Sequence, residues 1–167
     1  PGPASALPNW IDSLGFEPRA LLLTHIHLDH AGASGVLARR FPELRVYVSE
    51  VGAPHLIDPS KLLRSAGRLY GEENMADLWG EVAPVPEDRV FALAGGEEVE
   101  GFRVEHVPGH AGHHLAWLQH RPDHRADPVQ LAHIAKLAPE LAERPPQVLS
   151  VDFELTLRRF QLADAGA

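Results

Sequence analysis

The sequence has 167 residues, of which 44% are hydrophobic and 23% are charged, as in an ordinary folded domain with an apolar core. Its net charge is −8, so it lacks the basic character on which nucleic-acid binding depends, and no nucleic-acid partner is expected. It contains no cysteine, which excludes disulfides, thiolate metal sites and a cysteine nucleophile within these residues.

Hydropathy gives no sign of a membrane segment. No run of about eighteen apolar residues occurs, so a membrane-spanning helix is not expected. The opening Pro-Gly-Pro-Ala does not begin the basic and then apolar pattern of a secretory leader. We therefore expect a cytoplasmic protein that folds as one domain over residues 1–167.

The first half of the chain is predicted to alternate short helices with buried strands. A helix over 5–15 ends at a glycine, and the apolar segment 19–23 has the length and composition of a buried strand. A helix over 32–41 ends before a proline, which cannot continue it. The alternation of side chains at 44–48 predicts a second strand.

Residues 51–57 and 59–80 are predicted to be mostly helical. Apolar side chains in this segment form a stripe, and we expect the stripe to pack against neighbouring helices. The stripe consists of Leu62, Leu63, Leu69, Met75, Leu78 and Trp79.

The second half of the chain is predicted to contain further strands, a polar loop and one amphipathic helix. The strand at 102–107 ends before Pro108-Gly109, a pair that is typical of a turn. The other strands are expected at 115–118, 147–153 and 154–162, the loop at 119–128 and the helix at 129–143.

The segment Thr-His-Ile-His-Leu-Asp-His-Ala-Gly, residues 24–32, follows a predicted buried strand directly. Ligands bind at the carboxyl ends of strands in open α/β sheets. His25 and His27 are two residues apart in an extended segment, so their side chains can share a face. Asp29 and His30 begin the next turn and can face a second ion. One loop thus offers two ligands to each of two metal ions.

A distant histidine can complete the first of these sites. His110 stands just after the predicted strand 102–107, and Gly109 is expected to permit a backbone conformation that a residue with a Cβ resists. Three histidines leave one position of a tetrahedral zinc ion open for water, as in a catalytic zinc site. Two ions about 3.5–4 Å apart can also share a hydroxide, because zinc lowers the pKa of bound water to about 7.

Two other interpretations of this segment are weaker. A surface cluster of titrating histidines without metal does not account for the strand–loop–helix context together with a distant Pro-Gly-His. A Ser-His-Asp triad lacks the G-x-S-x-G turn that presents its serine, since neither Ser34 nor Ser49 has such a setting.

The two histidine-bearing segments together resemble the metallo-β-lactamase fold superfamily. The resemblance rests on residues 24–32 and on Val-Pro-Gly-His-Ala-Gly-His-His at 107–114. It covers residues 1–118 and implies an α+β fold, a four-layer αβ/βα sandwich with the metal ions at one edge of its two sheets. The resemblance is weak over 119–167, which leaves open whether this chain contains the whole fold.

Within the superfamily the chain is most similar to the glyoxalase-II-like hydrolases. This implies a first metal site of His25, His27 and His110, and a second site begun by Asp29 and His30. It further implies two zinc ions, with iron or manganese as alternatives, and a metal-bound hydroxide that attacks an ester or thioester bond of a small-molecule substrate. Asp29 would also orient that nucleophile, so it is the candidate catalytic residue.

Two parts of the family pattern have no plain counterpart in this sequence. They are a later aspartate that bridges both metal ions and a final histidine on the second ion. Asp152 follows an apolar run and is one candidate for the bridge. Asp123 and His124 are the alternative candidates for the missing pair, and the sequence does not decide between these assignments.

Two other functions stay open for this reason. A persulfide-dioxygenase-like relative holds one iron ion with two histidines and an aspartate, which here would be His25, His110 and a later aspartate. A non-catalytic relative would keep the loop and bind a ligand or partner, because Asp29 and His30 alone would hold a second ion weakly.

The remaining histidines near these segments have plainer interpretations. His113 and His114 are expected to lie behind the metal ligands or against the substrate rather than to bind metal. His106 shares a strand face with Phe102 and Val104, so we expect it to be packed within the protein.

Overall fold

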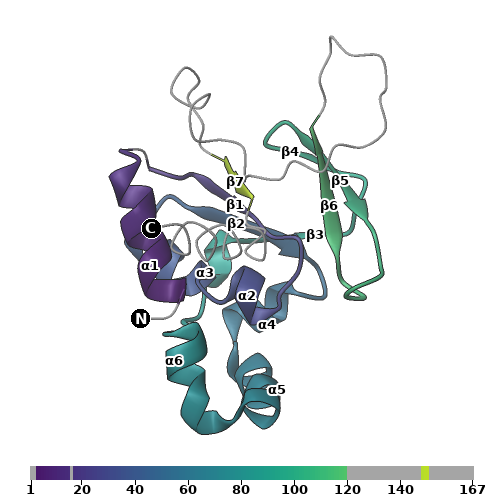
Figure 1. Ribbon diagram of the computed structural model, residues 1–167. Coiled ribbons are helices and arrows are strands. Elements are labelled where there is room, and N and C mark those ends of the chain that lie inside the picture. The colour runs from purple at the N-terminus through teal and green to yellow at the C-terminus, as the bar shows by residue number, and fades with distance from the viewer. Residues whose placement is uncertain (1–2, 16, 120–147, 151–167) are drawn as a thin grey trace, which may run out of the picture.

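The computed structural model describes residues 3–15, 17–119 and 148–150 (Figure 1). Within them, a parallel sheet has the strand order β3-β2-β1-β7 and an antiparallel sheet has the order β4-β5-β6. The strands are β1 (Ala20–Leu22), β2 (Arg45–Ser49), β3 (Val90–Leu93), β4 (Glu98–Val99), β5 (Phe102–His106), β6 (Leu115–Gln119) and β7 (Val148–Ser150).

Helices occupy the connections between the strands of the parallel sheet. Such connections are required because parallel neighbours need a crossover. The helices are α1 (Pro3–Ser13), α2 (Leu28–Ala31), α3 (Ser34–Arg40), α4 (Ala53–Ile57), α5 (Ser60–Tyr70) and α6 (Met75–Trp79), with 3-10 turns η1 (Glu72–Asn74) and η2 (Glu87–Arg89).

Strand β1 lies inside the parallel sheet, between β2 and β7. Leu21 pairs with Val46 on one side and with Leu149 on the other. All three residues of β1 are buried. A strand that is covered on both faces needs apolar side chains at every position, which is why the sequence of β1 is wholly aliphatic.

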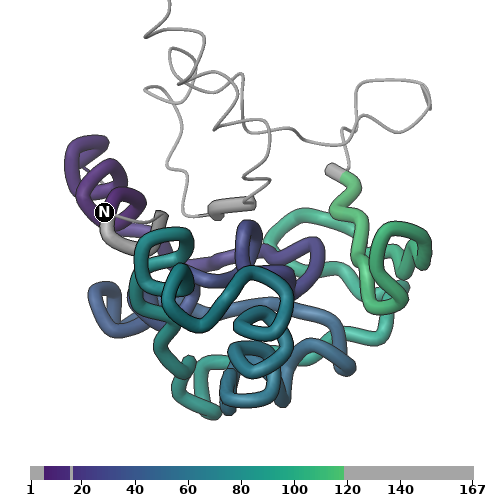
Figure 2. The backbone as a smooth tube through the Cα atoms, turned by 60° about the horizontal axis from the view of Figure 1, so that its bottom comes forward, coloured from purple at the N-terminus to yellow at the C-terminus, as the bar shows by residue number. Residues whose placement is uncertain are grey.

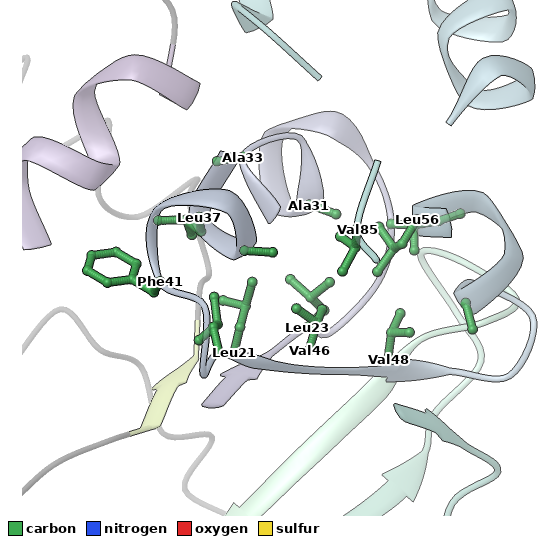
Figure 3. Packing of buried hydrophobic residues seen from close by; sticks show 14 of the residues in the cluster. Leu21, Leu23, Ala31, Ala33, Leu37, Phe41, Val46, Val48, Leu56 and Val85 are labelled. Carbon is green, nitrogen blue, oxygen red and sulfur yellow. The ribbon is translucent and has the colours of Figure 1, made fainter. Parts of the chain in front are cut away.

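The two faces of the parallel sheet belong to two different cores. Side chains alternate along a strand, so Leu21 and Leu23 face one way while Ala20 and Leu22 face the other. The first pair packs with helices, as Figure 3 shows for the cluster around Leu37. That cluster includes Ile11, Ala31, Phe41, Val46, Val48, Leu56 and Val85.

The second core lies between the two sheets. Ala20 and Leu22 pack there with residues of the antiparallel sheet. Figure 1 shows that sheet beside the parallel sheet, on the side away from α1. The residues that close this core are Tyr47, Leu93, Val104, Leu115 and Trp117. The described residues therefore build three layers, namely helices, parallel sheet and antiparallel sheet.

The predicted elements of residues 5–118 are largely confirmed, with one short helix that was not predicted. The segment predicted as a helix over 32–41 is α3, which begins at Ser34, and the separate short helix α2 precedes it. A helix of four residues is too short to show the periodicity on which the prediction depends. Strand β7 falls inside the predicted strand 147–153, whereas the predictions for 119–128, 129–143 and 154–162 fall on residues outside the described ones, apart from Gln119.

The prediction that the apolar stripe of α5 and α6 packs against neighbouring helices is confirmed only in part, because Leu62, Leu63, Met75 and Trp79 are partly buried whereas Leu69 and Leu78 are exposed. In the structure, 74% of Leu69 and 45% of Leu78 is exposed. In Figures 1 and 2 the teal segment with α5 and α6 lies outside the two sheets. Helical periodicity identified the elements correctly, but it does not reveal whether a partner surface exists.

The prediction that His106 is packed within the protein is also wrong. It is exposed at the end of β5, and its Nε2 lies 2.9 Å from the carbonyl oxygen of Gly112.

Among the described helices, none combines the length and apolar character that crossing a bilayer requires.

Candidate metal centre

The histidine-rich segment lies at the carboxyl end of β1. His25 and His27 belong to the connection from β1 to α2, whereas Asp29 and His30 lie within α2. His110 comes from the connection between β5 and β6 in the other sheet. The site therefore stands where the edges of the two sheets meet.

Three imidazoles from these two connections converge. His27 Nδ1 lies 3.1 Å from His25 Nε2 and 3.1 Å from His110 Nε2. The three nitrogens all lie within 4.8 Å of one another. The contact between the two connections joins His27 to His110, which are 83 positions apart in the sequence.

This arrangement fits a metal ion. A tetrahedral zinc ion with bonds of about 2.0–2.1 Å holds its nitrogen ligands about 3.3–3.4 Å apart. The two separations of 3.1 Å from His27 Nδ1 are close to this value. Hydrogen bonds among the three rings do not explain this arrangement well. His27 Nδ1 faces two ring nitrogens, but one nitrogen of a neutral imidazole either donates one N–H or offers one lone pair. A cation at the centre would accept all three lone pairs at once.

Thr24 orients the most buried of the three rings. His25 is 1% exposed, and its Nδ1 lies 3.0 Å from Thr24 Oγ1. When Nδ1–H donates to this hydroxyl, the lone pair of Nε2 is left facing the other two histidines. We did not single out Thr24 from the sequence, although it stands directly before His25.

Burial lowers the pKa of two of the three histidines. Burial, followed by repulsion from His30 and other neighbouring histidines, lowers the pKa of His25 to about 3. Burial and the nearby His110 also lower the pKa of His27. Neutral imidazole is the form that binds metal, so the two rings need not release a proton to do so near pH 7. His110 is exposed, which opens the group to solvent on its side.

Asp29 and His30 form a pair beside the three histidines rather than part of their group. His30 Nε2 lies 3.3 Å from Asp29 Oδ2, and this hydrogen bond is the main reason why the pKa of Asp29 is lowered. The His30 ring lies against His25, with 4.0 Å between ring centroids. The described residues thus provide a group of three candidate metal ligands and, beside it, a pair of two further candidate ligands.

The candidates for completing the second site lie outside the described residues. Asp152, Asp123 and His124 are all in that part of the chain. Their assignment stays a prediction.

His113 and His114 lie near the three histidines, as expected for residues behind them. The ring of His114 stacks on His25 with 4.8 Å between centroids. His113 Nε2 accepts a hydrogen bond of 3.3 Å from the backbone N–H of Ile26. Burial lowers the pKa of His113, so its ring is neutral and able to accept at pH 7.

The role expected for Gly109 is wrong. Its φ lies outside the left-handed region, and an added Cβ would meet no atom within 4 Å. The Pro-Gly pair identified the turn correctly, but the backbone reaches its conformation without needing a glycine.

A second hollow lies near the opposite end of the parallel strands. It is a cleft of about 340 Å³ lined by Arg19, Pro42, Glu43, Arg45 and Arg89. Arg45 is paired with Glu100 at 2.7 Å, and Arg89 donates to the carbonyl oxygen of Pro42 at 3.1 Å. These arginines already have partners within the fold, so the histidine group is the stronger candidate site.

Comparison with known proteins shows the family to which the chain is similar. The sequence profile of the metallo-beta-lactamase superfamily matches residues 2–126. A hydroxyacylglutathione hydrolase of Hamiltonella defensa subsp. Acyrthosiphon pisum (strain 5AT) is 47% identical over 117 residues, which is 70% of this chain. The match covers 36% of that relative, and the uncharacterized protein YobT of Bacillus subtilis (strain 168) is covered to 49%. The chain thus spans half or less of the length of these relatives.

Solved structures give the same result. A metallo-beta-lactamase superfamily protein of Sulfolobus tokodaii superposes with a TM-score of 0.54 at 28% identity, over 64% of this chain and 43% of that one. The protein TTHA1623, solved in a di-iron-bound form, gives 0.51 at 31% identity, over 68% and 50%. With the sequence profile covering most of the residues, the chain belongs to the metallo-beta-lactamase superfamily.

Proposed function

We propose that this chain is a metal-dependent hydrolase in which His25, His27 and His110 hold a metal ion. One observation carries the proposal, namely that three ring nitrogens from two sheets lie within 4.8 Å of one another, and that two of their separations, 3.1 Å each, are close to those around a tetrahedral ion. The lowered pKa values of His25 and His27 support it, because protons then compete little for their lone pairs near pH 7.

In this proposal the chain's own residues would bind the metal ion and orient its ligands. A metal ion held here supplies a Lewis acid that activates water and polarises a carbonyl group. Thr24 holds the ring of His25, and the buried side of the group keeps bulk water away. Substrate would approach from the side of His110, the exposed member.

We further propose zinc as the metal and Asp29 with His30 as the start of a second zinc site. Their position directly beside His25 supports this, as does the chemistry of an imidazole and a carboxylate. Iron is the alternative, since one solved relative was crystallised in a di-iron-bound form. Asp29 is the proposed catalytic residue, because its carboxylate would orient the attacking water.

The proposed substrate class is a thioester of a small thiol such as glutathione. Support comes from the hydroxyacylglutathione hydrolase that is 47% identical over the shared segment. The match covers 36% of that relative, so recognition of the thiol part by this chain is itself part of the proposal.

Metal analysis tests the first step. Protein purified without chelators should contain at least one zinc, iron or manganese ion per chain, and His110→Ala should lose most of it. His55→Ala is the matched control, because His55 makes no hydrogen bond to either connection in the described part of the chain. Wild-type protein free of all three metals would refute the proposal.

Hydrolysis of S-lactoylglutathione tests the second step. We expect turnover by the metal-loaded chain and none after chelation. Asp29→Ala should lower turnover while the metal held by the three histidines remains. An Asp29→Ala variant with unchanged turnover would exclude both the second ion and the catalytic role of Asp29.

An iron-dependent oxidoreductase is less well supported by the described residues. That reaction would use two histidines and an aspartate, whereas the converging group consists of three histidines. Iron in the purified protein with thiol-dependent oxygen uptake would favour it over thioester hydrolysis.

A further inference from the structure

The two connections that carry the three histidines are tied together by two hydrogen bonds. The backbone N–H of Leu115 donates to the carbonyl oxygen of Thr24 at 2.8 Å. The backbone N–H of Ile26 donates to His113 Nε2 at 3.3 Å. The first bond joins backbone to backbone and survives any side-chain substitution, whereas the second depends on the side chain at position 113.

The second bond acts on the residue between two of the candidate ligands. Ile26 separates His25 from His27, and the peptide units on either side of it are rigid planes. The Ile26 N–H lies in the plane that joins His25 to Ile26, so its position constrains the Cα of His25 directly and that of His27 through the φ and ψ of Ile26 alone. Ile26 is 5% exposed, so its N–H needs an acceptor within the protein.

His113 is placed to set the distance between the two connections. Its ring centroid lies 6.3 Å from that of His25 and 6.2 Å from that of His27, almost equally far from both. It follows His110 by three positions on the same short connection. It is not part of the converging group, and its Nε2 is already engaged with Ile26.

We propose that His113 is a positioning residue that holds the His25–His27 segment at the correct distance from His110 for all three to share one ion. This inference rests on the proposed function, because it assigns His113 a role in the affinity of that metal site. Partners behind metal ligands typically change metal affinity by about 10- to 100-fold when they are removed.

Competition with a chromophoric chelator would test it, with zinc as the probe and the purified full chain. His113→Leu keeps bulk and removes the acceptor, and we expect its zinc affinity to fall about 10- to 100-fold. His113→Gln carries an amide oxygen that can accept from Ile26, so it should restore most of the affinity. His55→Leu is the control and should bind as the wild type does.

Two further measurements separate positioning from folding. Urea unfolding of the metal-free proteins should give similar midpoints for His113→Leu and His113→Gln, although their zinc affinities differ. His113→Met, a more flexible side chain without a strong acceptor, replaces His113→Leu if the leucine variant does not fold. Cobalt-loaded variants without the acceptor should show an altered visible absorption spectrum, because the ligand geometry relaxes.

The outcomes distinguish the two proposals. Wild-type affinity in the variants that lack the acceptor would overturn the positioning role and leave the metal site standing. A loss in His113→Gln as large as in His113→Leu would do the same. A wild-type chain that binds no zinc, iron or manganese would overturn the proposed function and this inference together.

Discussion

His25 differs from the other candidate ligands in how completely it is enclosed. Its ring is buried, is held by Thr24 on one nitrogen, and faces His27 with the other. His110, by contrast, is exposed. The group therefore has a fixed inner ligand and an outer ligand at the solvent boundary, which suits a site that must stay assembled and still admit a substrate.

The low pKa of His25 predicts how the metal-free protein responds to acid. The folded-state pKa of about 3 lies below the ordinary value of 6.5, so the unfolded chain binds more protons between these values. The free energy of unfolding should therefore fall as pH drops below about 6.5, by on the order of 2 kcal/mol at pH 5 from this residue. Urea unfolding of chelator-treated protein at pH 7 and pH 5 measures it.

His25→Gln provides the comparison for that measurement. It removes the titrating group, so its stability should depend less on pH over the same interval. An equal loss in both proteins would show that His25 does not cause the acid sensitivity.

Thr24 gives a second prediction for a single residue. Thr24→Val keeps the shape of the side chain but removes the oxygen that lies 3.0 Å from His25 Nδ1. Loss of such a partner should weaken zinc binding by about 10- to 100-fold, as measured by chelator competition. Thr24→Ser keeps the hydroxyl and should bind nearly as tightly as the wild type. Equal affinities in all three proteins would exclude the orienting role.

At the level of elements, the site depends on how closely α3 approaches the rest of the fold. A Cβ added at Gly35 would lie 1.9 Å from the carbonyl oxygen of Ala83 and 2.8 Å from that of Pro84. These are backbone atoms, which cannot move aside as a flexible side chain can. Helix α3 is therefore fixed against the segment that leads to β3, and it follows α2 after a short turn.

Gly35→Ala should accordingly destabilise the protein. In an open helix the change would stabilise by roughly 0.5–1 kcal/mol, but overpacking of a close contact costs about 1–3 kcal/mol, so the clash should prevail. Thermal unfolding would detect this as a lower Tm. Gly112→Ala is the control, because a Cβ there meets no atom within 4 Å. A Gly35→Ala protein as stable as the wild type would contradict the close approach.

The elements also show what sequence patterns can and cannot predict. The aliphatic run of β1 predicted a buried strand, and the strand is there with its polar loop at the carboxyl end. Helix α2 was missed because four residues are too few for periodicity. The stripe around Leu69 predicted the helices but not their exposure, since burial depends on neighbours that a local pattern does not contain.

The same limit applies to the candidate site. The spacing of His25 and His27 predicted that they would share a face, and the distant Pro-Gly-His predicted that His110 would join them. The structure brings these three rings together, and their role as metal ligands stays a prediction. The bond between Ile26 and His113 could not be predicted, because it depends on backbone positions set by the meeting of two sheets. Thr24 stands next to His25, but the sequence does not reveal which ring nitrogen its hydroxyl faces.

For the whole molecule, a metal ion at this site would join the two sheets. His25 and His27 extend from the parallel sheet and His110 from the antiparallel one, so a shared ion would bind only the folded arrangement. Ligands that bind only the folded state stabilise it by about 2.7 kcal/mol at one hundred times their dissociation constant. We therefore expect zinc to raise the Tm and a chelator to lower it.

His110→Ala tests whether this stabilisation arises from the junction of the sheets. It should reduce the zinc-dependent rise in Tm and leave the Tm of the metal-free protein nearly unchanged, because His110 is exposed. An undiminished rise would place the stabilising ion elsewhere.

The hydrogen bond from Trp117 to the same edge of the parallel sheet has an optical consequence. Its indole Nε1–H donates to the carbonyl oxygen of Leu23 at 3.2 Å, across the boundary between the sheets and two residues before His25. The ring is 3% exposed, whereas Trp10 is 44% exposed and should emit as a solvated indole. In a Trp79→Phe protein, which lacks the other partly buried indole, blue-edge emission should therefore follow the loading of the centre without any label.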